Sequence, residues 1–226
     1  MDDVKKFGPV LHQFKFSEAI NPLDESEEPA LTDYQVAIVG IDNQWYESMI
    51  RNRSLVATNN DLTTDAETLA RQISVIKAMK DYDLRRMISF HSRIKGAEDS
   101  AREIKKVFDW MPKESAPSGE LIADSVKGNM PAGYRSDKIR KLAKISGDQR
   151  YILSNARCLT EGIDVPTLDG VIFFDPKFSQ VDIVQAVGRA IRLADKKEIG
   201  TIIVPVFIQD DKHAIESLEN SSFANA

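Results

Sequence analysis

Apolar and polar positions along the chain follow two alternating periods. Short runs rich in β-branched and aromatic residues are typical of buried strands. They occupy residues 35–41, 86–91, 121–126, 151–153, 171–174 and 200–207. Stretches with apolar residues three and four positions apart predict amphipathic helices between them. These are residues 64–80, 97–110, 135–146 and 180–193. The alternation predicts an α/β fold: an open, mainly parallel sheet with helices on both faces.

The predicted helix of residues 180–193, QVDIVQAVGRAIRL, has two different faces. Its apolar side carries Ile183, Val184, Val187, Ala190 and Ile191. Another face carries Gln185, Gly188, Arg189 and Arg192. A glycine inside a helix costs about 1 kcal/mol relative to alanine, so Gly188 indicates close approach of a backbone or a phosphate. Two arginines beside it suit a polyanion, with an ordinary solvated surface helix as the alternative.

Composition and charge narrow the class of protein. The 226 residues suffice for one large domain, or one domain with an appendage. A net charge of -5 and a pI near 5.3 exclude a uniformly basic surface but leave room for a local phosphate-binding strip. The single cysteine, Cys158, gives no intrachain disulfide and fits a reducing cytoplasm. The three histidines lack metal-ligand spacing, so no metal site is predicted, and no apolar run reaches membrane-spanning length.

The carboxyl ends of the predicted strands are the expected location of a ligand site. Ser92, Arg93 and Ser154 are placed at this edge by the strand pattern. Residues 159–166, LTEGIDVP, continue the same edge. Within them the Thr160 hydroxyl could donate to a phosphate, and Gly162 allows a backbone to come close. A tight turn with an Asx interaction is the alternative for residues 162–164.

Three of these stretches together resemble a known superfamily. QAVGRAIR at 185–192 resembles motif VI of superfamily-two helicases and translocases, a Q-x-x-G-R-x-x-R box that carries arginine fingers. LTEGIDVP resembles motif V, and ISFHSR at 88–93 resembles motif IV. Motifs V and VI occur in the family's order at a plausible separation. The longer stretches LSNARCLTEGIDVP and FFDPKFSQVDIVQAVGR most resemble the motor parts of restriction-type enzymes and DEAD/DEAH-box relatives.

The resemblance implies a role for each matched residue. Arg189 and Arg192 would stabilise the charge on the transferred γ-phosphoryl group, and Gln185 would position the nucleotide or the attacking water. The residues implied to contact the nucleotide are Gly162, Asp164 and Gly188, with Asp164 accepting from a ribose hydroxyl or holding an arginine of the motif VI helix. The residues implied to contact nucleic acid, DNA in preference to RNA, are Ser92, Arg93, Ser154, Thr160 and Glu161.

The resemblance also divides the chain and implies partners. Residues 1–34 would lead across from a first motor lobe, residues 35–208 would form the second RecA-like lobe, and residues 209–226 would be a tail that starts a helix. The sequence has no G-x-x-x-x-G-K-[ST] and no D-E-x-[DH] box. ATP and Mg²⁺ would therefore be bound mainly by the first lobe of the parent chain, and we expect this chain alone to hydrolyse ATP negligibly.

Two rival functions follow from other readings of the same fold. A non-catalytic module that docks nucleic acid or protein is the alternative to a motor lobe, although the intact set of Gln185, Arg189 and Arg192 argues against a degenerate site. A dinucleotide-binding enzyme is excluded because no G-x-G-x-x-G joins a predicted strand to a helix.

Overall fold

A parallel six-stranded sheet forms the centre of the structure. The computed structural model describes residues 15–22, 24, 26, 28–41, 66–156, 165, 167–175, 180–195 and 197–207. The strands are β1 (Asp33–Ile41), β2 (Arg86–His91), β3 (Leu121–Lys127), β4 (Arg150–Ala156), β5 (Gly170–Phe173) and β6 (Ile199–Phe207). Their order is β1-β6-β5-β2-β4-β3, and all five neighbouring pairs are parallel. The predicted open parallel sheet is confirmed.

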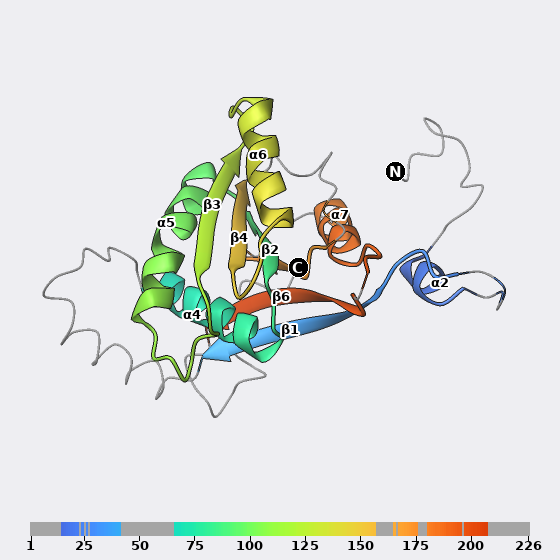
Figure 1. The fold of residues 1–226 in the computed structure, drawn as a ribbon, viewed down its shortest axis with the longest axis horizontal. Coiled ribbons are helices and arrows are strands. Elements are labelled where there is room, and N and C mark those ends of the chain that lie inside the picture. Colours follow the sequence, from blue (N-terminus) through green and yellow to red (C-terminus); the bar gives the residue numbers. More distant parts are fainter. Residues whose placement is uncertain are drawn as a thin grey trace, which may run out of the picture.

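Helices cover both faces of this sheet (Figure 1). The described helices are α2 (Phe16–Ile20), α4 (Ala66–Asp81), α5 (Ile94–Trp110), α6 (Ala132–Ala143) and α7 (Gln180–Ala190). One apolar core joins α4 and α5 to the sheet, and a second core joins α6 and α7 to the opposite face. Successive strand residues point to opposite faces, so Met87 belongs to the first core and Ile88 to the second. No helix within the described ranges is long and apolar enough to cross a lipid bilayer.

The strand β1 lies at one edge of the sheet and is apolar on a face that the described helices leave open. Tyr34, Val36 and Ile38 are 42%, 54% and 56% exposed, whereas Ala37 on the opposite face is buried. The sequence predicts a buried strand here, and that prediction is wrong for one face. The physical reason is the position of the helices: α4 packs on β1, whereas α7 packs on β5 and β6.

The segment before β1 packs against the end of α7. The amides of Ala30 and Leu31 both donate to the carbonyl of Ala19, at 2.8 and 3.1 Å. Leu31 then forms an antiparallel bridge with Arg192. The amide and the hydroxyl of Thr32 donate to the carbonyl of Ile191, at 2.8 and 3.1 Å. The described part of residues 1–34 therefore fixes where the chain leaves α7.

A buried arginine stabilises the amino edge of the sheet, where the strands begin. Arg150 is 7% exposed, and its Nη1 donates to the carbonyls of Leu84 at 2.5 Å and Met79 at 3.2 Å. Its Nη2 lies 2.7 Å from Oδ1 of Asp83, a residue in the left-handed region with φ 46°. These contacts attach the first residue of β4 to the turn between α4 and β2. They hold β4 and β2 in register at the amino edge, and the candidate site lies at the other, carboxyl edge of these strands.

Candidate nucleotide and nucleic-acid site

The loop that follows β2 is held in place by the residue that follows β5. The backbone amide and the hydroxyl of Ser92 both donate to Oδ2 of Asp175, at 2.6 and 2.9 Å. Arg93 comes next; it is exposed and occupies the cap position of α5 with no side-chain cap bond. The structure therefore confirms that Ser92 and Arg93 lie at the carboxyl edge of the sheet. Asp175 is a positioning residue that the sequence reading left without a role.

The fold directs positive helix ends to the same edge. In a parallel sheet, a helix that follows a strand begins near the carboxyl edge of that strand, as α5 and α6 do here. Neither helix has an acidic residue in its first turn. The unpaired amides and the helix dipole at these ends therefore favour anions. Tyr134, in the first turn of α6, is 68% exposed beside them.

Ser154 does not lie at this edge, so its predicted placement is wrong. The strand β4 continues to Ala156, which puts Ser154 inside the sheet with no exposed surface. The hydroxyl of Ser89 on β2 donates to the Ser154 hydroxyl at 3.0 Å. This pairing allows a polar residue to sit in a central strand, where the sequence pattern suggested that the strand had ended. A side chain buried in this way has no surface to offer a nucleic acid.

The helix α7 brings the predicted catalytic residues together. Nη1 of Arg189 donates to the backbone carbonyl of Gln185 at 3.2 Å, so these residues share one face, as the spacing predicts. Burial, and secondly repulsion from Arg192, lowers the pKa of the Arg189 guanidinium. Repulsion of this kind requires the two guanidinium groups to be within electrostatic reach of each other. Gln185 is exposed, and the two arginines are part-buried.

The helix is shorter than predicted, and one residue of its predicted apolar side is exposed. It ends at Ala190 rather than Leu193, because Thr32 donates to the carbonyl of Ile191 and the backbone of Arg192 forms an antiparallel bridge with that of Leu31. Val184, predicted on the apolar side, is 51% exposed. The residues that the helix end buries are Ala186, Val187, Ala190 and Ile191.

Two glycines shape the surroundings of α7. A side chain at Gly200 would meet the carbonyl oxygen of Ala190 at 2.3 Å, so only glycine allows the end of α7 to sit on β6. Sequence periodicity does not reveal a role for Gly200, because this contact joins two elements that are distant in the sequence. Gly188 differs, since the nearest described atom to an added Cβ would be Cζ of Phe16 at 3.8 Å. That distance is ordinary van der Waals contact, so packing among the described residues does not require a glycine there.

The stretch that resembles motif V is described only at Val165. Thr160, Glu161, Gly162 and Asp164 all lie outside the described residues. Their roles remain those that the resemblance implies.

The sheet order, the polar loops at its carboxyl edge and the arginine-bearing helix after β5 define a RecA-like lobe. The DNA-bound structure of the ATP-dependent Type ISP restriction-modification enzyme LlaBIII is similar, with a TM-score of 0.74 and 30% identity over 92% of this chain and 14% of that one. A fragment of a putative HsdR subunit of a type I restriction enzyme from Vibrio vulnificus YJ016 shares the fold, with a TM-score of 0.56 and 17% identity, over 98% of this chain and 38% of that one.

Sequence comparison gives the family. The model of the helicase conserved C-terminal domain matches residues 68–194, inside the lobe predicted for residues 35–208. The chain belongs to this family and is a second RecA-like lobe of superfamily two. A curated relative, the ATP-dependent RNA helicase DBP7 of Coccidioides immitis (strain RS), is 26% identical over 140 residues, 56% of this chain and 18% of the relative. The chain thus spans less than a fifth of the length of DBP7 and of LlaBIII.

Proposed function

We propose that the chain is the C-terminal motor lobe of an ATP-dependent helicase or DNA translocase, and that it completes a nucleotide site built mainly by a first lobe. The observation that carries this proposal is the meeting of Gln185, Arg189 and Arg192 at the end of α7. Two like charges that repel each other in a part-buried position are stabilised when a polyanion lies between them.

The same geometry assigns roles in phosphoryl transfer. Arg189 and Arg192 would face the γ-phosphoryl oxygens, where an arginine finger contributes about 10³ to 10⁵ in rate. Gln185 would orient the nucleotide or the attacking water. Gly188 would leave room for the phosphates, in keeping with the absence of close packing around it among the described residues. Gly162 and Asp164 would contribute the rest of this lobe's nucleotide contacts.

Mg²⁺ and most of the phosphate contacts are assigned to the first lobe. The sequence of this chain has neither a phosphate-binding G-x-x-x-x-G-K-[ST] loop nor a D-E-x-[DH] box. Hydrolysis in the full-length protein would open and close the cleft between the lobes, so that contacts on each lobe move along the strand in turn.

Nucleic acid would run along the carboxyl edge of the sheet. Ser92 is fixed there by Asp175, Arg93 is exposed beside it, and the starts of α5 and α6 add backbone amides. Thr160 and Glu161 are proposed to extend this contact. DNA is proposed as the substrate because LlaBIII, the similar structure with 30% identity, is bound to DNA.

A salt titration of single-stranded DNA binding tests the nucleic-acid half of the proposal. The logarithm of the affinity should fall linearly with the logarithm of the salt concentration, by about 0.7 for each phosphate contacted. Arg93→Ala should reduce the slope by about one such contact. Arg140→Ala is the matched control, because Arg140 is exposed on the last turn of α6 and pairs with Asp137 at 3.2 Å. Binding without salt dependence, or equal effects of the two variants, would contradict the proposed contact.

A further inference from the structure

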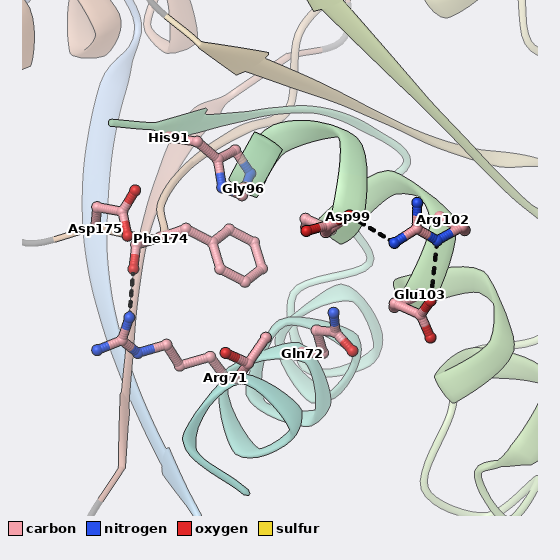
Figure 2. Close-up of a pocket in the computed structure, with 11 residues that line it drawn as sticks. Arg71, Gln72, His91, Gly96, Asp99, Arg102, Glu103, Phe174 and Asp175 are labelled. Carbon is pink, nitrogen blue, oxygen red and sulfur yellow. Dashed lines mark hydrogen bonds and ion pairs between the residues drawn. The ribbon is translucent and has the colours of Figure 1, made fainter. Parts of the chain in front are cut away.

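A cavity between α4 and α5 opens near the carboxyl ends of β2 and β5 (Figure 2). Its volume is about 250 Å³, and we name it the α4–α5 pocket. The wall residues that matter below are Gln72, Asp99, Ser100, Glu103, Phe174 and Asp175. The pocket lies apart from α7 and its arginines, but Asp175 also holds Ser92 of the proposed nucleic-acid path. The α4–α5 pocket therefore adjoins the proposed path of the nucleic-acid strand.

Buried polar atoms in this wall have no partner within the described part of the chain. Gln72 is fully buried, and neither its amide nitrogen nor its amide oxygen makes a hydrogen bond there. The same holds for Oγ of Ser100 and Oε2 of Glu103, residues that are 5% and 4% exposed. Leaving such a group unsatisfied lowers stability, so native structures rarely do so without a function. Figure 2 shows the Gln72 side chain extending from α4 into the space between Phe174 and Glu103.

The charges of the wall exclude a phosphate as the occupant. Three carboxylates, Asp99, Glu103 and Asp175, face two guanidinium groups, Arg71 and Arg102. Asp99 and Glu103 pair with Arg102, and Glu103 also pairs with Lys106, so the wall offers an anion no excess of positive charge. A metal ion is also disfavoured, since the described residues contain no group of three or more His, Cys, Asp or Glu side chains arranged to hold one. The pocket therefore suits a neutral ligand that both donates and accepts hydrogen bonds.

The arrangement of donors and acceptors identifies the kind of ligand. The oxygen of the Gln72 amide and Oε2 of Glu103 both accept, whereas the Gln72 amide nitrogen donates. Phe174 adds an aromatic wall, whose ring is stacked on His91 at 4.8 Å between centroids. An exocyclic amine donates two hydrogen bonds, and the ring nitrogen beside it accepts one. Adenine and cytosine carry this pair, as does guanine through N2 and N3, whereas thymine and uracil would turn a carbonyl oxygen toward two acceptors.

We propose that the α4–α5 pocket binds an amino-bearing nucleobase, adenine, cytosine or guanine, through Gln72 and Glu103. One source of the base is the nucleic-acid strand that the lobe follows, with the base turned out of its stack. For this source the inference rests on the proposed function. The same chemistry would accept the base of a free nucleoside. The two sources are separated by the ligands used in the test.

The test compares strand binding with nucleoside binding. Affinities for oligo-dA, oligo-dC and oligo-dT of equal length are measured by fluorescence anisotropy at one salt concentration, and adenosine, cytidine and uridine are titrated by NMR. One bidentate contact gives at least about fivefold discrimination, so dA and dC should bind at least that much more tightly than dT. Discrimination among strands alone indicates a base turned out of the strand, and discrimination among nucleosides alone indicates a free ligand.

Variants of the pocket wall test whether the α4–α5 pocket causes the discrimination between bases. Gln72→Met keeps the shape of the side chain and should abolish the discrimination without lowering the melting temperature, because it removes an unsatisfied amide. Glu103→Gln should weaken the discrimination, because an amide can also donate to the carbonyl of thymine. Gln149→Met, at the amino edge of the sheet, is the matched control and should leave it unchanged.

The outcomes separate the two proposals. Discrimination that survives Gln72→Met, or equal binding of all bases in both assays, overturns the pocket assignment. Salt-dependent binding of oligo-dT would still support the nucleic-acid path in that case. Loss of all strand binding would instead count against the proposed function.

Discussion

A buried histidine beside the candidate site makes the stability of the fold depend on pH. His91, the last residue of β2, is 4% exposed, and its Nε2 lies 3.1 Å from the hydroxyl of Ser89. Burial lowers the pKa of His91 to about 4, against the opposing effect of the Asp175 carboxylate. The folded protein therefore holds the imidazole neutral near pH 7 and resists its protonation.

The sign and size of the effect follow from the two pKa values. The pKa of His91 is about 4 in the folded protein, against an ordinary value of 6.5 when unfolded. The unfolded chain therefore binds a proton first as the pH falls, and stability is lost between pH 6.5 and 4. The complete loss is about 3 kcal/mol, at roughly 1.4 kcal/mol per pH unit, and the step from pH 7 to pH 5 accounts for about 2 kcal/mol of it.

Urea denaturation of the chain at pH 7, 6 and 5 measures this loss, with His91→Gln as the reference. Carboxylates elsewhere titrate in both proteins, so their contribution cancels in the difference between the two. Between pH 7 and pH 5 the free energy of unfolding of the unsubstituted chain should fall by about 2 kcal/mol more than that of His91→Gln. Equal losses in the two proteins would refute the assignment of a buried, neutral imidazole.

Two further predictions concern positions away from the pocket. Arg150→Met should lower the free energy of unfolding by about 3 kcal/mol in urea denaturation, because two buried carbonyls lose their donor; Arg140→Met, at an exposed arginine on α6, should cost less than about 1 kcal/mol. Gly188→Ala should raise the free energy of unfolding by up to about 1 kcal/mol, since its Cβ meets only the ring of Phe16, and should lower ATP turnover in the full-length protein. A destabilised Gly188→Ala lobe would show that packing, not the nucleotide, requires the glycine.

The periodicity of the sequence predicts strands well where both faces of the strand are buried. The strand β2 has the predicted bounds, and the sheet is parallel throughout. The helix α5 begins at Ile94, three residues before the predicted start. Strand β1 was misjudged, because an apolar run does not reveal that a strand will lie at a sheet edge with one uncovered face. The length of β4 was misjudged because the bond between Ser89 and Ser154 depends on a strand distant in sequence.

The same limit applies to the site. Gln185, Gly188 and Arg189 share one helix, so spacing alone could place them. The contact between Asp175 and Ser92 spans 83 positions, and the clash that requires Gly200 arises from the end of another element. The strand pattern places Asp175 at the carboxyl edge of the sheet, but only the fold shows that it accepts from Ser92. The roles of the residues that resemble motif V remain predictions.

The pair of arginines at the end of α7 is the centre of the account, and ATP turnover by the full-length protein tests it most directly. Arg189→Ala and Arg192→Ala should each lower kcat by about 10³-fold or more, while the Kd for ATP changes little. Val184→Ala, at an exposed position on the same helix, should leave both constants unchanged. Unchanged turnover in the arginine variants, or an equal loss of ATP binding and turnover, would contradict the assignment.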